Sequence, residues 1–140
     1  MTAHVVYPSW DADRPATFSP TIMNNVLRNS LRFEGVIMSD DLEMQAIEDK
    51  MEAIPERGVQ AGVDIFLICH DLKKVNTLQD AMIRDIESGK VPRTAIDQSV
   101  ARIFKVKQRL RVTKDARHNF ENILEENKSL AKEMQTFYKE

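Results

Sequence analysis

Cysteine and glycine are scarce in this sequence. Among 140 residues there are one cysteine and four glycines. The single cysteine, Cys69, excludes an internal disulfide and favours a reducing compartment. Because Cys69 lies inside an apolar run, we predict that it is a buried structural thiol.

An excess of charge of either sign is also missing, since 20 basic and 22 acidic residues leave a formal net charge of -2. This balance gives no electrostatic basis for binding nucleic acid or an anionic membrane. A basic stretch over residues 102–117 lacks interleaved aromatic residues, so we interpret it as the solvated face of a helix. Apolar runs long enough to span a membrane and a signal-peptide pattern are absent. We therefore expect a cytoplasmic protein with neither nucleic acid nor membrane as a partner.

The sequence does contain short apolar runs that alternate with amphipathic helical patterns. The expected elements are strands at residues 3–7, 36–38 and 65–69, and helices from Ser19, from Pro55, over about 72–88, from Thr94 and over 113–140. This alternation favours an α/β fold with a parallel sheet, and units of about 30 residues suit an eight-stranded α/β barrel. Metal-ligand spacings and glycine-rich phosphate loops are absent, so we expect no metal and no cofactor.

Two adjacent carboxylates, Asp40 and Asp41, come directly after the central strand. In a parallel α/β fold the carboxyl end of a strand displays reacting groups, which favours a catalytic site. The structural alternative is a helix cap, because Asp40 and Glu43 form a capping-box pattern in which Asp40 accepts the first free amide protons. Spacing alone favours the cap, and both interpretations stay open at this point.

Four stretches of the sequence carry a family resemblance. They are Ser39-Asp40-Asp41-Leu42-Glu43-Met44 after a Gly-Val-Ile-Met strand, and the segments at residues 1–8, 14–19 and 61–71. In this order they resemble the β-N-acetylhexosaminidases of glycoside hydrolase family 3. The resemblance implies that residues 1–112 form a partial (β/α)8 TIM barrel, its last three strand–helix units, with a C-terminal amphipathic helix over residues 113–140. It also implies that Asp40 is the catalytic nucleophile and that Met44 and His70 bind substrate.

The implied activity is retaining hydrolysis of terminal N-acetylglucosamine from a saccharide, as in cell-wall muropeptide recycling. In this family the general acid is a histidine in a Lys-His-Phe-Pro-Gly-His-Gly type segment, which this sequence lacks. We interpret His4 as a satisfied, partly buried strand histidine and His118 as solvated. For His70 the alternative to the sugar pocket is a loop position, with Asp71 capping the next helix. For Met44 the alternative is helix packing.

The first residue of the chain aligns with an internal position of the family, so we expect a truncated, nucleophile-bearing part that is inactive alone. Three parallel strands cannot close a barrel and leave two sheet edges. We therefore expect self-association, or a separate chain that supplies the missing half of the barrel. The alternative is a non-catalytic oligomerising or interaction module derived from such a barrel.

Overall fold

The computed structural model describes residues 1–47, 50–109, 123–125, 127–130 and 132. The chain divides into two compact units, Met1–Gln108 and Arg109–Glu140. Residues 123–125, 127–130 and 132 are helical, and the rest of the helix predicted over 113–140 lies outside the described residues, so the boundary at residue 112 stays a prediction. Among the described residues, no helix is both long enough and apolar enough to cross a membrane.

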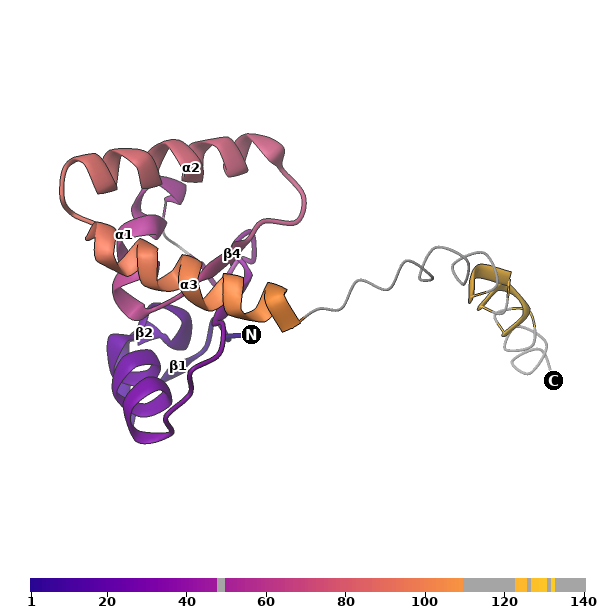
Figure 1. Cartoon of the computed structure of the whole chain (residues 1–140), viewed down its shortest axis with the longest axis horizontal. Helices are drawn as coiled ribbons and strands as arrows, with labels where there is room; N and C mark the ends of the chain where they lie inside the picture. The colour runs from indigo at the N-terminus through magenta and orange to yellow at the C-terminus, as the bar shows by residue number, and fades with distance from the viewer. Residues whose placement is uncertain (48–49, 110–122, 126, 131, 133–140) are drawn as a thin grey trace. The chain divides into compact units, whose positions relative to one another are not determined.

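Helices and short strands alternate in the first unit, and the α/β class predicted from the sequence is confirmed. In chain order the elements are β1 (Val6–Tyr7), β2 (Asp11–Pro15), the 3-10 turn η1 (Ala16–Phe18), the π-helix η2 (Thr21–Ser30), β3 (Met38–Asp41), the 3-10 turn η3 (Met51–Ala53), α1 (Ile54–Ala61), β4 (Ile65–Leu67), α2 (Leu72–Glu87) and α3 (Arg93–Arg109). The β1–β2 hairpin and η2 lie at one end of this unit and α2 lies at the opposite end (Figure 1).

The chain before β1 runs alongside β3. The Thr2 N–H donates to the Met38 carbonyl oxygen at 2.8 Å, and two residues later His4 Nε2 lies 3.1 Å from the Asp41 carbonyl oxygen. The two segments therefore advance in the same direction. The β1–β2 hairpin, which follows this segment, therefore begins near the carboxyl end of β3, where Asp41 lies.

Between the strand predicted at residues 3–7 and the helix predicted from Ser19, the structure contains a second strand, β2, which the sequence pattern did not predict. β1 and β2 pair antiparallel with Tyr7 opposite Asp11, and the Trp10 N–H donates to the Tyr7 carbonyl oxygen at 2.9 Å, which closes the turn. β2 reads Asp-Ala-Asp-Arg-Pro. Such a polar segment has no apolar alternation by which a strand could be recognised.

The helix predicted after Ser19 is present, but it is wound as a π-helix. The Ser19 hydroxyl accepts the Ile22 N–H at 3.2 Å and so satisfies one of the free N–H groups at the start of the helix. At the other end the Leu31 N–H donates to the carbonyl oxygen of Val26, five residues back, at 2.9 Å. Leu27 packs against the core, whereas Leu31 is 68% exposed. The wider π turn moves Leu31 off the stripe that a 3.6-residue period assigns to it.

β3 and β4 form a parallel pair with Asp41 opposite Leu67 and an irregular register within β3. The strand predicted at residues 36–38 begins only at the last of these and includes both acids. The Ser39 hydroxyl accepts the Leu67 N–H at 2.9 Å, and the Leu42 N–H donates to the Leu67 carbonyl oxygen at 2.9 Å. A side-chain hydroxyl thus takes part in the pairing, and the strand extends past its apolar run.

α2 and α3 begin and end near the predicted residues but bury less apolar surface than their patterns suggest. Gly89, with φ of 79°, follows the C-terminal end of α2, where a glycine adopts the left-handed conformation without strain. Leu78 of α2 packs against the core, whereas Ile83 of α2 and Phe104 of α3 are exposed. Both helices therefore keep part of an apolar stripe at the surface of the described unit.

Two apolar clusters form the core, and Phe66 of β4 packs against both. The first contains Ala16, Ile22, Met23, Ile37 and Val63. The second contains Phe18, Leu42 and Ile54. β4 therefore joins the packing around η2 to the packing around α1.

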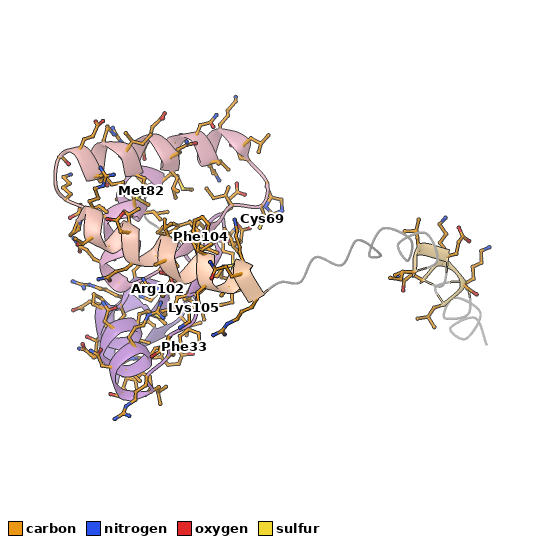
Figure 2. All side chains as sticks on the ribbon, in the orientation of Figure 1. Phe33, Cys69, Met82, Arg102, Phe104 and Lys105 are labelled. Carbon is orange, nitrogen blue, oxygen red and sulfur yellow. The ribbon has the colours of Figure 1, made fainter. Side chains whose placement is uncertain are left out.

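A buried ion triad fixes the start of β4. The Asp64 carboxylate, with 0% of its side chain exposed, pairs with Arg28 of η2 at 2.8 Å and with Arg102 of α3 at 2.7 Å. It also accepts the Ile37 N–H at 2.8 Å and the Ser99 hydroxyl at 2.7 Å. Burial opposes ionisation of Asp64, but hydrogen bonds from Arg102, Ile37 and Ser99 outweigh it and lower the pKa of this carboxyl. In Figure 2 Arg102 and Lys105 project from α3 on the side of the segment that carries Phe33.

Candidate active site

The carboxyl end of β3 displays the acid pair. Ser39 is buried beneath it, and Asp40 and Asp41 are half-buried. The Asp41 N–H donates to Asp40 Oδ1 at 2.8 Å. This hydrogen bond orients the Asp40 carboxyl group at the end of β3.

The helix cap proposed for Asp40 is wrong. Residues 42–47 form turns without a helix, and the Glu43 N–H donates to Asp41 Oδ1 at 3.1 Å, so the acid that accepts from the turn is Asp41. The Met44 N–H then donates to the Asp41 carbonyl oxygen at 3.2 Å. The capping pattern fails because Glu43, its second member, turns toward a different part of the chain.

The Glu43 carboxylate binds the loop between β4 and α2. Its Oε2 accepts the N–H groups of Cys69 at 3.1 Å, His70 at 2.6 Å and Asp71 at 3.3 Å. Its Oε1 lies 3.1 Å from Lys74 Nζ, and only 8% of the side chain is exposed. Burial opposes ionisation of Glu43, but the hydrogen bonds from His70, Lys74 and Asp71 outweigh it and lower its pKa from 4.5 to about 2. This role could not be predicted from the sequence, because an acid at this position matches half of a capping-box pattern.

The lowered pKa of Glu43 predicts a specific acid sensitivity. A carboxyl group with a folded pKa of about 2 and an ordinary pKa of 4.5 contributes stability that is complete above about pH 4.5 and is lost as the pH falls toward 2. We expect Glu43→Gln to lower the thermal unfolding midpoint at neutral pH, and we expect the difference from wild type to narrow between about pH 4.5 and 2. Thermal unfolding followed by circular dichroism across this pH range measures the two midpoints. A difference between the midpoints of wild type and Glu43→Gln that stays constant down to about pH 2 contradicts the prediction.

The structure brings predicted site residue His70 to the acid pair. The His70 Nδ1 atom lies 3.5 Å from Asp41 Oδ2 and 3.3 Å from Glu43 Oε2, while 79% of the side chain is exposed. Asp71 also caps α2, accepting the Lys73 N–H at 2.8 Å, so the loop alternative describes the same segment correctly. A role of His70 in binding substrate stays a prediction.

Met44, the other predicted substrate contact, lies in the turn after β3 and is 45% exposed. The helix packing considered for it is wrong, since no helix forms over residues 42–47. Its contact with substrate stays a prediction. Cys69 is exposed, which corrects the prediction of a buried thiol; Figure 2 shows it at the β4–α2 loop.

His4 is hydrogen-bonded and partly buried, as predicted, but the strand predicted at residues 3–7 is wrong in part, because β1 covers only Val6–Tyr7 and His4 precedes it. Its ring is partly buried, with Nδ1 2.9 Å from the Thr17 hydroxyl and Nε2 3.1 Å from the Asp41 carbonyl oxygen. His118 lies outside the described residues. Beside His4 is a cavity of about 300 Å³, lined by His4, Val6, Asp13, Pro15, Ala46, Ile47 and Arg57. It lies between the hairpin and the turn after β3, on the carboxyl side of the strand.

In this α/β chain the parallel strand β3 ends in two adjacent carboxylates, Asp40 and Asp41. Enzymes with parallel α/β folds commonly carry their reacting groups at this end of a strand. The chain belongs to glycoside hydrolase family 3, because the model of the glycosyl hydrolase family 3 N-terminal domain matches residues 1–106. The family resemblance seen in the sequence is confirmed. The chain is therefore a member of a family of glycosidases.

The proteins similar to this chain include β-hexosaminidases and β-N-acetylglucosaminidases. The chain is 32% identical over 129 residues to β-hexosaminidase A of Pseudoalteromonas piscicida, a match that covers 79% of this chain and 22% of that protein. It is 45% identical over 73 residues to the β-hexosaminidase of Nitrosomonas eutropha, covering 51% of this chain and 21% of that protein. The solved β-N-acetylglucosaminidase of Thermotoga maritima matches with a TM-score of 0.75 and 30% identity, over 80% of this chain and 25% of that one. The family 3 β-N-acetylglucosaminidase of Paenibacillus sp. str. FPU-7 matches with a TM-score of 0.75 and 33% identity, over 82% of this chain and 24% of that one.

The chain thus spans a quarter or less of the length of each of these relatives. The activity and the substrate of these relatives are properties of the whole proteins. For this chain they are therefore proposals.

Proposed function

We propose that this chain is the nucleophile-bearing part of a retaining β-N-acetylhexosaminidase that releases terminal N-acetylglucosamine from saccharides. The observation that carries the proposal is the position of Asp40, half-buried at the carboxyl end of parallel strand β3, within the segment matched by the family model. The proposed setting is the cytoplasm, with muropeptides of the cell wall as the source of substrate.

The fold that we propose for the complete site is a (β/α)8 barrel of which this chain supplies the last three units. The parallel pairing of β3 and β4 supports it, as does the N-terminal segment, which runs beside β3 in the same direction. In such a barrel the three carboxyl ends line one mouth, and the acids of β3 and the loop after β4 belong to it.

In the proposed reaction a carboxylate oxygen of Asp40 attacks the anomeric carbon, and the bond from that carbon to the leaving oxygen breaks. The leaving oxygen takes a proton from a general acid, and water then hydrolyses the glycosyl ester. Asp40 is suited to the first step because the Asp41 N–H orients its carboxyl group at the end of β3. The family's histidine segment, which supplies the acid, does not occur in this sequence.

We therefore expect the isolated 140-residue chain to lack glycosidase turnover, because loss of general-acid help alone costs about two to four orders of magnitude. The assay is hydrolysis of a chromogenic N-acetylglucosaminide by the chain alone. The matched comparison is a chimera in which residues 1–106 replace the corresponding segment of the Thermotoga maritima β-N-acetylglucosaminidase. We expect turnover by the chimera, and robust turnover by the isolated chain that Asp40→Ala abolishes contradicts the prediction.

The second candidate function is a non-catalytic module that associates with copies of itself or with another chain. The observation that favours it is the exposure of Val5, Val6, Tyr7 and Trp10 along and beside the hairpin. The chimera separates the two functions. A folded chimera without turnover favours the module, whereas turnover that depends on Asp40 favours the hydrolase.

A further inference from the structure

The loop between β4 and α2 is held to the turn after β3 by one carboxylate. Three successive N–H groups converge on Glu43 Oε2, directly before the 16-residue helix α2. Successive amides of this kind form a concave positive site, and the start of the helix adds to it. Glu43 occupies this site from the turn after β3, so it fixes the position of the loop relative to the acid pair.

The imidazole of His70 is the group that this attachment orients. Its Nδ1 atom faces Asp41 Oδ2 at 3.5 Å and Glu43 Oε2 at 3.3 Å. Ionised carboxylates only accept hydrogen bonds, so a neutral ring beside them carries its proton on Nδ1. Its Nε2 atom is then the nitrogen with a free lone pair, on a side chain that is largely exposed.

We infer that Glu43 is a positioning residue of the saccharide site, which holds His70 in the Nδ1–H tautomer and presents Nε2 as an acceptor for a sugar hydroxyl. This inference rests on the proposed function, because it takes the carboxyl end of β3 as the saccharide site. Glu43 acts through His70 and the loop and is not itself a reacting group. Fixing a histidine tautomer through the group that its other nitrogen faces is an established device in enzyme sites.

Nuclear magnetic resonance of the 140-residue chain tests the inference without any saccharide. The chain has three histidines, so the ring nitrogen signals are few, and a His70→Gln variant assigns those of His70. The tautomer ratio is read from these signals at about pH 8, where the neutral form is observed. Hydrogen exchange of the N–H groups of residues 69–71 is followed in the same samples, and circular dichroism checks folding.

Two variants of Glu43 are compared with one control. Glu43→Gln removes the charge, and Glu43→Asp keeps it on a side chain shorter by one C–C bond of about 1.5 Å. The control Lys74→Met removes the cation at Oε1 but leaves the three amide hydrogen bonds at Oε2. If only the charge of Glu43 matters, Glu43→Asp leaves the tautomer ratio of His70 unchanged. If Glu43 positions the loop, Glu43→Asp changes the ratio as Glu43→Gln does.

We expect the Nδ1–H tautomer to predominate in wild type and in Lys74→Met. In both Glu43 variants we expect the ratio to reverse toward Nε2–H and the three N–H groups to exchange faster. A wild-type ring that is mainly Nε2–H, or a ratio that neither Glu43 variant changes, overturns the inference. Failure of the proposed function is seen separately: if the ratio behaves as expected but Asp40 is not the nucleophile, the saccharide role falls and the attachment of the loop remains.

Discussion

Replacing Asp40 with asparagine is expected to reduce turnover by the chimera by about 10⁴-fold or more, the scale on which loss of a nucleophile acts. An amide oxygen does not form the glycosyl ester, so the first bond-making step is lost. Folding is expected to be unchanged, because the Asp41 N–H that donates to Asp40 Oδ1 finds a carbonyl acceptor in asparagine. The measurement is kcat/KM on a chromogenic N-acetylglucosaminide, with the thermal midpoint of each variant.

Asp41→Asn is the matched control for this prediction. Asp41 is adjacent and also half-buried, but its Oδ1 accepts the Glu43 N–H and its Oδ2 lies 3.5 Å from His70 Nδ1. We expect a milder loss, within about one to two orders of magnitude, because orientation of the loop is disturbed while the nucleophile remains. Equal losses in the two variants argue against a unique role for Asp40.

Replacing Asp64 with alanine is expected to lower the free energy of unfolding of the 140-residue chain by about 3 to 5 kcal/mol, the cost of removing one partner from a buried ion pair. The carboxylate is fully buried, and both Arg28 and Arg102 lose their partner. A small domain is stable by about 5 to 15 kcal/mol, so such a loss leaves a marginal fold. Urea denaturation measures the change.

Glu34→Ala provides the control for Asp64. Glu34, which lies outside any helix, pairs with Lys105 of α3 at 3.6 Å, but 84% of the Glu34 side chain is exposed. Exposed pairs of this kind contribute about 0 to 1 kcal/mol. If Asp64→Ala costs no more than Glu34→Ala, the triad does not fix α3 and η2 to the start of β4.

Local chemistry predicted those parts of the fold that depend on neighbouring residues. The Ser19 hydroxyl, the Asp71 carboxylate and Gly62 each act at a helix end as their residue types suggest. The bounds of α2 follow from its period and from Gly89. These signals are short-range, and they survive in the folded chain because nothing distant competes with them.

Distant contacts decided the parts that the sequence did not predict. Glu43 accepts from N–H groups 26 to 28 residues away, and this contact removes it from the cap that its spacing suggests. Asp64 meets Arg28 and Arg102, which lie 36 and 38 residues away along the chain, and no local pattern links these residues. Within the candidate site, Asp40 and His70 could be named as candidates from the sequence, whereas Glu43, which joins the turn after β3 to the loop after β4, could not.

Covalent trapping tests the central claim most directly. The chimera is incubated with a fluorinated N-acetylhexosamine analogue that forms a slowly hydrolysed glycosyl ester, and the labelled peptide is mapped by mass spectrometry. The proposed function predicts a single label on Asp40, absent from the Asp40→Asn variant. A label on Asp41 or Glu43, retained when Asp40 is replaced, contradicts it.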